Sequence, residues 1–233
     1  MNRVVAAARM QLVHPLLIVG IPWAIVGSSF AINLAIWQVG DVAAQAPGDG
    51  STGGLAALYI TILVGFVQAV TQYFPFATGL SLSRREFYLG TALAAAMEAV
   101  VYGIALTGLT AIENATNGWG VRLHFWAPGA LDVGNPFLQF FVFAVPMLGC
   151  AFLGMGIGVV FKRWGATGLY AVTLGALLIG GLAAVWLTWH EVWGDVGSWL
   201  ADLPVTSLTV VLPALVAAVL AGLTFLGLRR TVP

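Results

Sequence analysis

Glu98 is the residue in this sequence whose position most directly suggests chemistry. It is the only ionisable side chain well inside one of the long apolar stretches of the chain. A carboxylate in the core of a bilayer costs several kcal/mol unless it is protonated or paired, so such groups usually face the interior of a helix bundle. Glu98 could therefore be a hydrogen-bonded group between helices or a polar group that lines a substrate path. We favour helix packing, since single intramembrane carboxylates are common in helix contacts.

Polar side chains at helical spacing surround this carboxylate. Tyr102 follows Glu98 by four residues and Thr91 precedes it by seven, so the three share one helix face. The preceding apolar stretch carries a second polar face, on which Gln68 lies at about the depth of Glu98, roughly 10–12 Å from the cytoplasmic end. If the two helices pack together, one intramembrane polar patch or translocation path is expected, formed by Thr61, Gln68, Thr71, Gln72, Glu98 and Tyr102.

The residues that could bind a metal or act in covalent catalysis do not have the spacing that either role needs. His14, His124 and His190 fall in different loops, without the spacing of a metal site, and the single cysteine, Cys150, lies in an apolar run. No Gly-x4-Gly-Lys-Ser/Thr loop is present, so ATP would not bind to this chain through a P-loop. We therefore expect no enzyme activity, metal or cofactor on this chain. A formal net charge of zero also argues against nucleic-acid binding.

The elements that position these residues follow from composition. Of 233 residues, 60% are hydrophobic and 8% are charged, whereas soluble domains have about 25% charged residues. A soluble fold of this length could not hide so much apolar surface. The chain is therefore expected to be an all-α integral membrane protein.

Six apolar stretches are long enough to cross a bilayer, which requires roughly 20 residues per helix. The loops between them are too short to fold on their own, so residues 1–233 are predicted to form a single transmembrane domain. The predicted spans are about 15–39, 55–76, 91–112, 137–160, 167–188 and 206–228.

The distribution of basic residues predicts the orientation. Eight of the nine Lys and Arg residues fall on one side of the six-span arrangement, and only Arg122 falls on the other. Cytoplasmic loops concentrate Lys and Arg. Both termini are therefore expected to be cytoplasmic.

Two segments are predicted to form short helices outside the spans. On the inner side, Ser83 and Glu86 have the spacing of a capping box, so a helix should begin there, expose Phe87 and Tyr88 near the membrane surface, and run into the third span. On the outer side, residues 189–203 have apolar side chains at helical spacing, which predicts an interfacial helix. That helix would anchor the chain or gate an external exit. Its aromatic residues are Trp189, Trp193 and Trp199.

These features together resemble an ABC transporter permease of the type-2 exporter class. The resemblance lies in the six spans, the interfacial segment before the last span, and the sequence Gly-x3-Ser-Arg-Arg-Glu-Phe-Tyr after the second. The stretch Phe74–Gly120 and the sequence Phe161-Lys162-Arg163-Trp164-Gly165 are similar to those of actinobacterial members. The resemblance implies a multi-pass protein of the bacterial cell membrane.

It further implies that residues 82–89 form a coupling helix seated on a separate ATP-binding subunit, which would hold ATP and Mg²⁺. Residues 1–13 would form a connecting helix along the membrane. Two permease copies would pair, as a homodimer or with a paralogue, and move a drug-like or lipid-like amphiphile by alternating access among membrane lipids. The coupling residues would be Leu82, Ser83, Arg84, Arg85, Glu86, Phe87 and Tyr88.

Two other functions remain open from the residues alone. A self-sufficient carrier or channel could use Glu98 as an ion or proton site. An intramembrane enzyme is the weaker alternative, because the sequence has no catalytic constellation.

Overall fold

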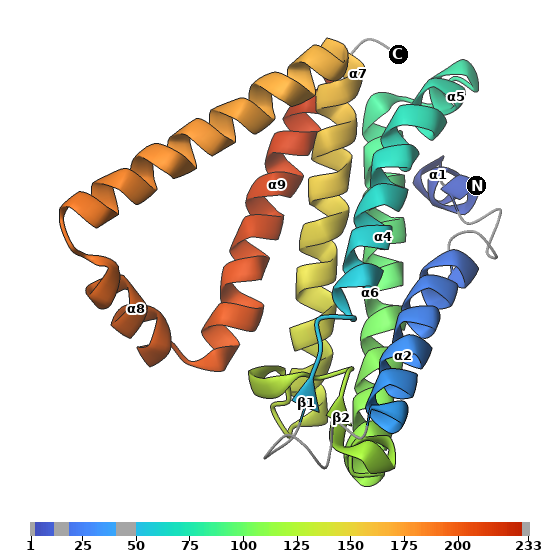
Figure 1. The fold of residues 1–233 in the computed structure, drawn as a ribbon. Helices are drawn as coiled ribbons and strands as arrows, with labels where there is room; N and C mark the ends of the chain where they lie inside the picture. Colours follow the sequence, from blue (N-terminus) through green and yellow to red (C-terminus); the bar gives the residue numbers. More distant parts are fainter. Residues whose placement is uncertain (1–2, 12–18, 41–49, 230–233) are drawn as a thin grey trace.

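The computed structural model describes residues 3–11, 19–40 and 50–229. His14, Arg230, the first residues of the predicted span 15–39 and the ends of the predicted connecting helix lie outside these ranges. Within them the chain is almost entirely helical (Figure 1). Its elements are α1 (Arg3–Gln11), α2 (Ile21–Val39), β1 (Gly50–Ser51), α4 (Ala56–Gln68), the π-helical turn η2 (Ala69–Tyr73), α5 (Phe74–Gly79), α6 (Arg84–Ala115), η3 (Gly118–Arg122), β2 (Leu123–His124), η4 (Gly129–Leu131), α7 (Pro136–Trp189), α8 (Trp193–Asp202), η5 (Ser207–Val211) and α9 (Leu212–Arg229).

Five of the described helices are long and apolar enough to cross a membrane. They are α2, the continuous helix Ala56–Gly79, α6, α7, and the continuous helix Ser207–Arg229. The all-α membrane architecture expected from composition is therefore confirmed. The fourth and fifth predicted spans both fall within α7, which the structure gives as one element of 54 residues. At about 1.5 Å per residue, α7 is roughly 80 Å long, far more than the core of one bilayer.

The predicted turn between those two spans is a bend at Gly165. The backbone of Gly165 has φ 65° and ψ −158°, outside the helical region. A side chain would clash in that conformation, and glycine has none. Before the bend, α7 packs in the bundle; beyond it, the helix leaves the bundle and runs obliquely to α8 (Figure 1). The second half is therefore exposed on most sides, as in Leu178 and Ile179.

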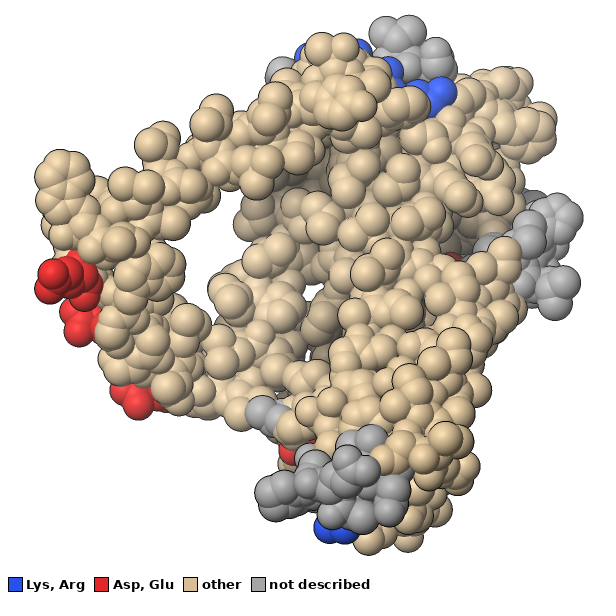
Figure 2. All heavy atoms as spheres, viewed as in Figure 1, with Lys and Arg blue, Asp and Glu red and all other residues tan. Residues whose placement is uncertain are grey.

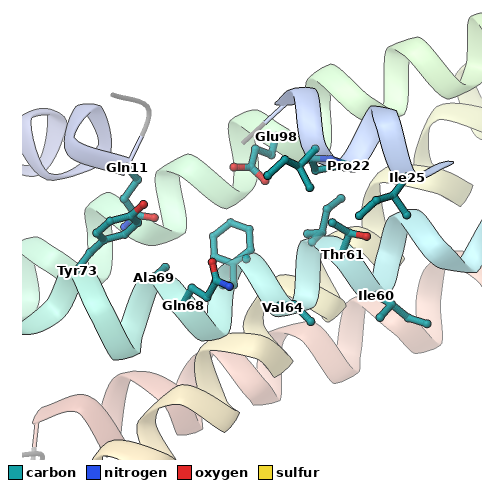
Figure 3. A pocket seen from close by; sticks show the side chains of 14 residues that line it. Gln11, Pro22, Ile25, Ile60, Thr61, Val64, Gln68, Ala69, Tyr73 and Glu98 are labelled. Atoms are coloured by element: carbon teal, nitrogen blue, oxygen red, sulfur yellow. The ribbon is translucent and has the colours of Figure 1, made fainter. Parts of the chain in front are cut away.

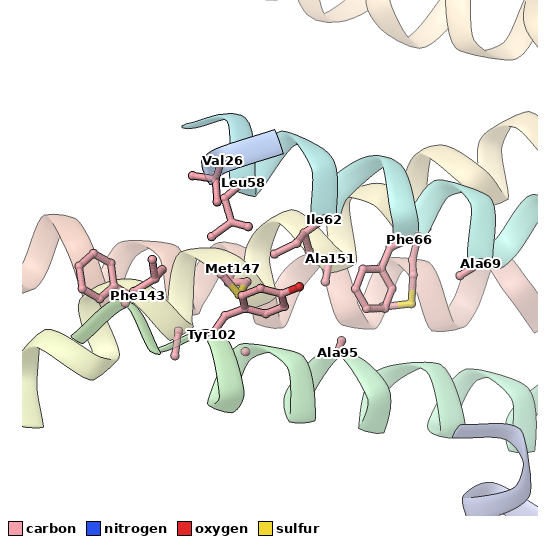
Figure 4. Close-up of a cluster of buried hydrophobic side chains, with 14 of the residues drawn as sticks. Val26, Leu58, Ile62, Phe66, Ala69, Ala95, Tyr102, Phe143, Met147 and Ala151 are labelled. Atoms are coloured by element: carbon pink, nitrogen blue, oxygen red, sulfur yellow. The ribbon is translucent and has the colours of Figure 1, made fainter. Parts of the chain in front are cut away.

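The core of the bundle lies between α4, α6 and the first half of α7 (Figure 4). Small residues bring the helix backbones together: a Cβ atom on Gly154 of α7 would lie 2.3 Å from the carbonyl oxygen of Leu63 in α4. Without a hydrophobic driving force in lipid, such close backbone packing is a main source of helix association. The large side chains in this core include Leu58, Phe66, Tyr102, Phe143, Met147 and Met155.

The capping box predicted at the start of the third span is confirmed. The Glu86 backbone N–H donates to the Ser83 hydroxyl (3.2 Å), and the Ser83 N–H donates to the Glu86 carboxylate (2.8 Å). The helix that starts there is not separate from the span, since α6 continues without a break to Ala115.

The exposure predicted for Phe87 and Tyr88 is wrong, because both side chains are buried. Phe87 packs against Phe74 of α5, with ring centroids 5.3 Å apart. Tyr88 packs against Phe225 of α9, and its hydroxyl donates to the Ala221 carbonyl (2.8 Å). The first turns of α6 therefore pack against both α5 and α9. A partner could reach only the polar side of these turns of α6.

The predicted outer helix is present as α8, Trp193–Asp202. Trp189 instead ends α7, and a short turn separates the two helices. Trp189, Trp193 and Trp199 are all exposed. Exposed indoles suit the membrane–water interface, where the apolar part of the ring can face lipid and the N–H group can bond to water.

Charged side chains separate along the long axis of the molecule. Figure 2 shows most of the basic side chains gathered at the end where α7 bends, one basic group at the opposite end, and acidic side chains along the segment that contains α8. Between these ends the visible surface carries almost no charge. The separation is that of a protein whose apolar middle lies in lipid.

Candidate ligand pocket and its supports

A pocket of about 400 Å³ lies between α4 on one side and α1, α2 and α6 on the other (Figure 3). This volume is within the ordinary range for sites that hold a small organic molecule. Most of its walls are apolar, and its polar groups come from three helices. The lining residues are Gln11, Ile21, Pro22, Ile25, Ile60, Thr61, Ile62, Val64, Gly65, Phe66, Gln68, Ala69, Tyr73 and Glu98.

The structure brings half of the predicted polar patch to this pocket. Thr61, Gln68 and Glu98 all line it, with Gln68 and Glu98 on facing helices. Glu98 makes no hydrogen bond or ion pair with any residue that the structure describes. A carboxylate placed there for helix packing would bond across the interface. Among the described residues no such bond is present at Glu98.

The other three residues of the predicted patch do not line the pocket. The Thr71 hydroxyl donates to the Val67 carbonyl of its own helix (2.9 Å). Gln72 is exposed. Tyr102 is buried one turn beyond Glu98, where its ring stacks on Trp23 of α2 with centroids 5.6 Å apart. Tyr102 thus forms part of the packing at the outer end of the pocket.

Gln11 lines the pocket without having been predicted, because its place depends on how α1 docks. A Cβ atom on Gly90 would lie 2.5 Å from the Cβ of Ala7, so α1 rests directly on the backbone of α6. The Gln11 amide donates a hydrogen bond to the Thr91 hydroxyl, which is buried. α1 therefore connects the inner end of α6 to the pocket wall.

The inner end of α6 carries the arginines predicted to couple to a partner. Arg84 donates to the backbone carbonyl of Arg229 in α9 (2.7 Å). Arg3 of α1 approaches Glu86 at 3.9 Å. Glu86 lies before the predicted span 91–112, and its bonds to Ser83 and the nearby Arg3 hold the pKa of its carboxyl below the ordinary value. Three helices, α1, α6 and α9, thus meet at this basic end.

Glu113 is a buried carboxylate that sequence reasoning missed. It lies near the outer end of α6 and is fully buried. One oxygen accepts the indole N–H of Trp119 (3.0 Å) and the backbone N–H of Phe125 (2.9 Å); the backbone N–H groups of Trp126 and Ala127 approach the other at 3.2 and 3.4 Å. Glu113 thereby ties residues 119–127 to the end of α6.

This loop closes the bundle at the C-terminal end of α6 with aromatic rings. Its chain reverses through residues with positive φ, including Asn117 (53°) and Gly118 (66°), which tolerate that conformation. Phe30 of α2 packs against Trp119, Phe125 and Trp126, with ring centroids 5.0–5.4 Å apart. The turn residues Asn117-Gly118 signal the reversal in the sequence, but only the fold shows that the loop returns to Glu113.

Among the described residues, no group of three His, Cys, Asp or Glu could hold a metal ion. Comparison with protein-family models, with characterised proteins and with solved structures gives no match. The function must therefore be argued from the pocket and its surroundings.

Proposed function

We propose that this chain is the transmembrane subunit of an ATP-driven exporter that moves an amphiphilic molecule across the bacterial cell membrane. The proposal that this chain takes part in transport rests on the pocket with Glu98 on its wall. A cavity within apolar helices, lined by a carboxylate without a partner among the described residues, suits a transported molecule better than a structural contact.

The proposed topology has six spans with both termini in the cytoplasm. Support comes from the length of α7, whose two parts on either side of Gly165 would each form one crossing. It also comes from the basic residues at the bend of α7 and at the start of α6, which favour a cytoplasmic location for that end. In this arrangement α8 lies at the outer surface, as an anchor or as part of the exit.

Energy would come from a separate ATP-binding subunit, as the resemblance to type-2 permeases implies. The docking point would be the polar side of the first turns of α6, with Arg85 exposed there. Movement of that end would pass to α1 through Gly90, to α9 through Arg84, and along α6 to the pocket. A second copy of this chain, or a paralogue, would complete the transporter.

The test is co-purification. The full-length chain is produced together with each candidate ATP-binding subunit of its source genome, and the ATPase activity of any purified complex is measured. We expect a stable complex whose activity falls at least fivefold when Arg84 and Arg85 are both changed to alanine. Lys162→Ala, which removes a basic group from the same end on α7, is the matched control and should retain full activity. Failure of the two chains to co-purify would argue against the proposal.

One alternative has support from a specific observation. Because Glu98 lines the pocket without a partner among the described residues, it could bind a proton in a self-sufficient carrier. Such a carrier would move its substrate in liposomes that contain this chain alone, driven by a pH gradient, and Glu98→Gln would abolish that movement.

A further inference from the structure

We propose that the pocket binds a lipophilic monovalent organic cation, with its positive charge at Glu98 and its apolar body between Ile25 and Ile60. This rests on the proposed transport function and names the substrate class for the same site.

The charges of the described side chains that line the pocket do not balance. Among the described residues that line the pocket, Glu98 is the only charged one, and none is Lys, Arg or His. Its carboxylate has no hydrogen bond or ion pair within the described residues. Glu98 is half-buried, and a charge partly removed from water with no counter-charge is costly in an apolar medium. A bound cation would supply the missing charge.

The shape of the pocket selects the kind of cation. Dehydrated inorganic cations need several oxygen ligands within about 2.6 Å, and no cluster of three acidic or metal-binding side chains exists among the described residues. A space of about 400 Å³ with apolar walls instead fits an organic body. The ligand class is thus an organic cation rather than a metal or alkali ion.

The polarity of the walls orients the ligand. In Figure 3, Gln11 and Tyr73 lie toward one end and Ile25 and Ile60 toward the other, with Glu98 and Gln68 between them on facing helices. Amide and hydroxyl oxygens can accept hydrogen bonds from an ammonium group or its hydration shell. At the isoleucine end the polar group is the Thr61 hydroxyl, which already donates to the Ala57 carbonyl of its own helix (2.7 Å), and the isoleucine side chains offer apolar contact. An amphiphile with one charged end matches this gradient.

Gly65 provides a way to fill the pocket without disturbing the helices. It lines the cavity, and a Cβ atom there would meet no other atom within 4 Å. Gly65→Leu should therefore occupy space that a ligand needs while leaving the backbone of α4 unstrained, and leucine also favours a helix over glycine. Gly65→Leu therefore tests the effect of filling the pocket separately from the effect of removing the charge of Glu98.

The experiment measures binding of radiolabelled tetraphenylphosphonium to the purified full chain in an uncharged detergent by equilibrium dialysis. Triphenylphosphine oxide, which has three phenyl rings and no net charge, is the neutral comparison. We expect saturable binding of the cation at one site per chain. Glu98→Gln should weaken it at least tenfold and leave binding of the neutral compound within twofold. Glu191→Gln, the same chemical change at an exposed position near α8, should alter neither.

Gly65→Leu should weaken binding of the cation at least tenfold with Glu98 intact. Circular dichroism and gel filtration confirm that each variant remains folded. Cation binding that is unsaturable, or that withstands both Glu98→Gln and Gly65→Leu, would overturn the inference. Because no ATP-binding subunit is present, this outcome is separate from failure of the proposed function, which shows itself in co-purification and ATPase activity.

Discussion

Replacement of Glu113 by alanine tests how the outer loop is held. In the native chain this carboxylate accepts hydrogen bonds from the Trp119 indole and from the backbone N–H groups of Phe125 and Trp126, at 2.9–3.2 Å. All three bonds reach a side chain that is fully buried. Alanine removes every acceptor atom and leaves these donors facing a void.

The expected cost follows from the number of donors. A buried donor without a partner costs about 1–3 kcal/mol, so three donors set an upper range near 9 kcal/mol. Removal of the buried carboxylate itself recovers part of this, because its own desolvation no longer opposes folding. Water that enters the void satisfies further donors. We therefore expect Glu113→Ala to lower the free energy of unfolding by about 3 kcal/mol.

The assay is unfolding of the purified chain in mixed micelles with increasing dodecyl sulfate, followed by circular dichroism and by tryptophan fluorescence. Trp119 and Trp126 lie at the carboxylate, so fluorescence should report loss of the outer loop before circular dichroism reports loss of the helices. Glu191→Ala, at an exposed position, is the control and should change stability by less than about 0.5 kcal/mol.

Glu113→Gln refines the test, because it keeps the shape of the side chain and one acceptor oxygen. Because one acceptor oxygen remains, we expect a smaller loss than in Glu113→Ala, about 1–2 kcal/mol. A loss remains because the amide group would place two N–H donors where the native carboxylate accepts. If Glu113→Ala and Glu191→Ala were equally stable, the hydrogen bonds at Glu113 would not hold the loop, and the reasoning would be refuted.

Three further changes test other contacts. Gly154→Leu should destabilise the bundle by about 2 kcal/mol in thermal unfolding, because its Cβ would lie 2.3 Å from the backbone of α4; Gly149→Ala, whose Cβ meets no atom within 4 Å, should not. Ser83→Ala should cost about 0.5–2 kcal/mol in the same assay through loss of the helix cap, and an unchanged midpoint would deny the cap a role. Gly90→Val should lift α1 from α6. In a chain whose native cysteine has been removed, a cysteine in place of the buried Ala7 should then react with maleimide only in the Gly90→Val background. Equal labelling in the native Gly90 and Gly90→Val backgrounds would contradict the contact between α1 and α6.

The sequence predicts those features that depend on local chemistry or on the thickness of a bilayer. The apolar stretches 55–76, 91–112 and 206–228 lie within long described helices, because length and hydropathy alone decide whether a segment can cross lipid. The Ser83 and Glu86 capping box is a contact within four residues, so its spacing suffices. The polar faces of two neighbouring helices similarly predict that Gln68 and Glu98 line the same space.

Features that depend on contacts between distant parts of the chain could not be predicted from the sequence. Burial of Phe87 and Tyr88 requires α5 and α9, and Tyr88 bonds to a carbonyl 133 residues away. The partners of Glu113 are mostly backbone N–H groups in a loop, which leave no pattern of residue types. Gly165 marks a bend, yet hydropathy cannot tell a bend between helical segments from a loop.

The most direct test of the central proposal is transport by inverted membrane vesicles that contain this chain and its ATP-binding subunit. Uptake of tetraphenylphosphonium is measured with and without ATP, after the pH gradient and membrane potential have been abolished. The account predicts uptake that requires ATP and falls at least tenfold in Glu98→Gln. Uptake that does not depend on ATP, and that appears when a pH gradient is imposed on vesicles without the ATP-binding subunit, would contradict it and identify the chain as a self-sufficient carrier.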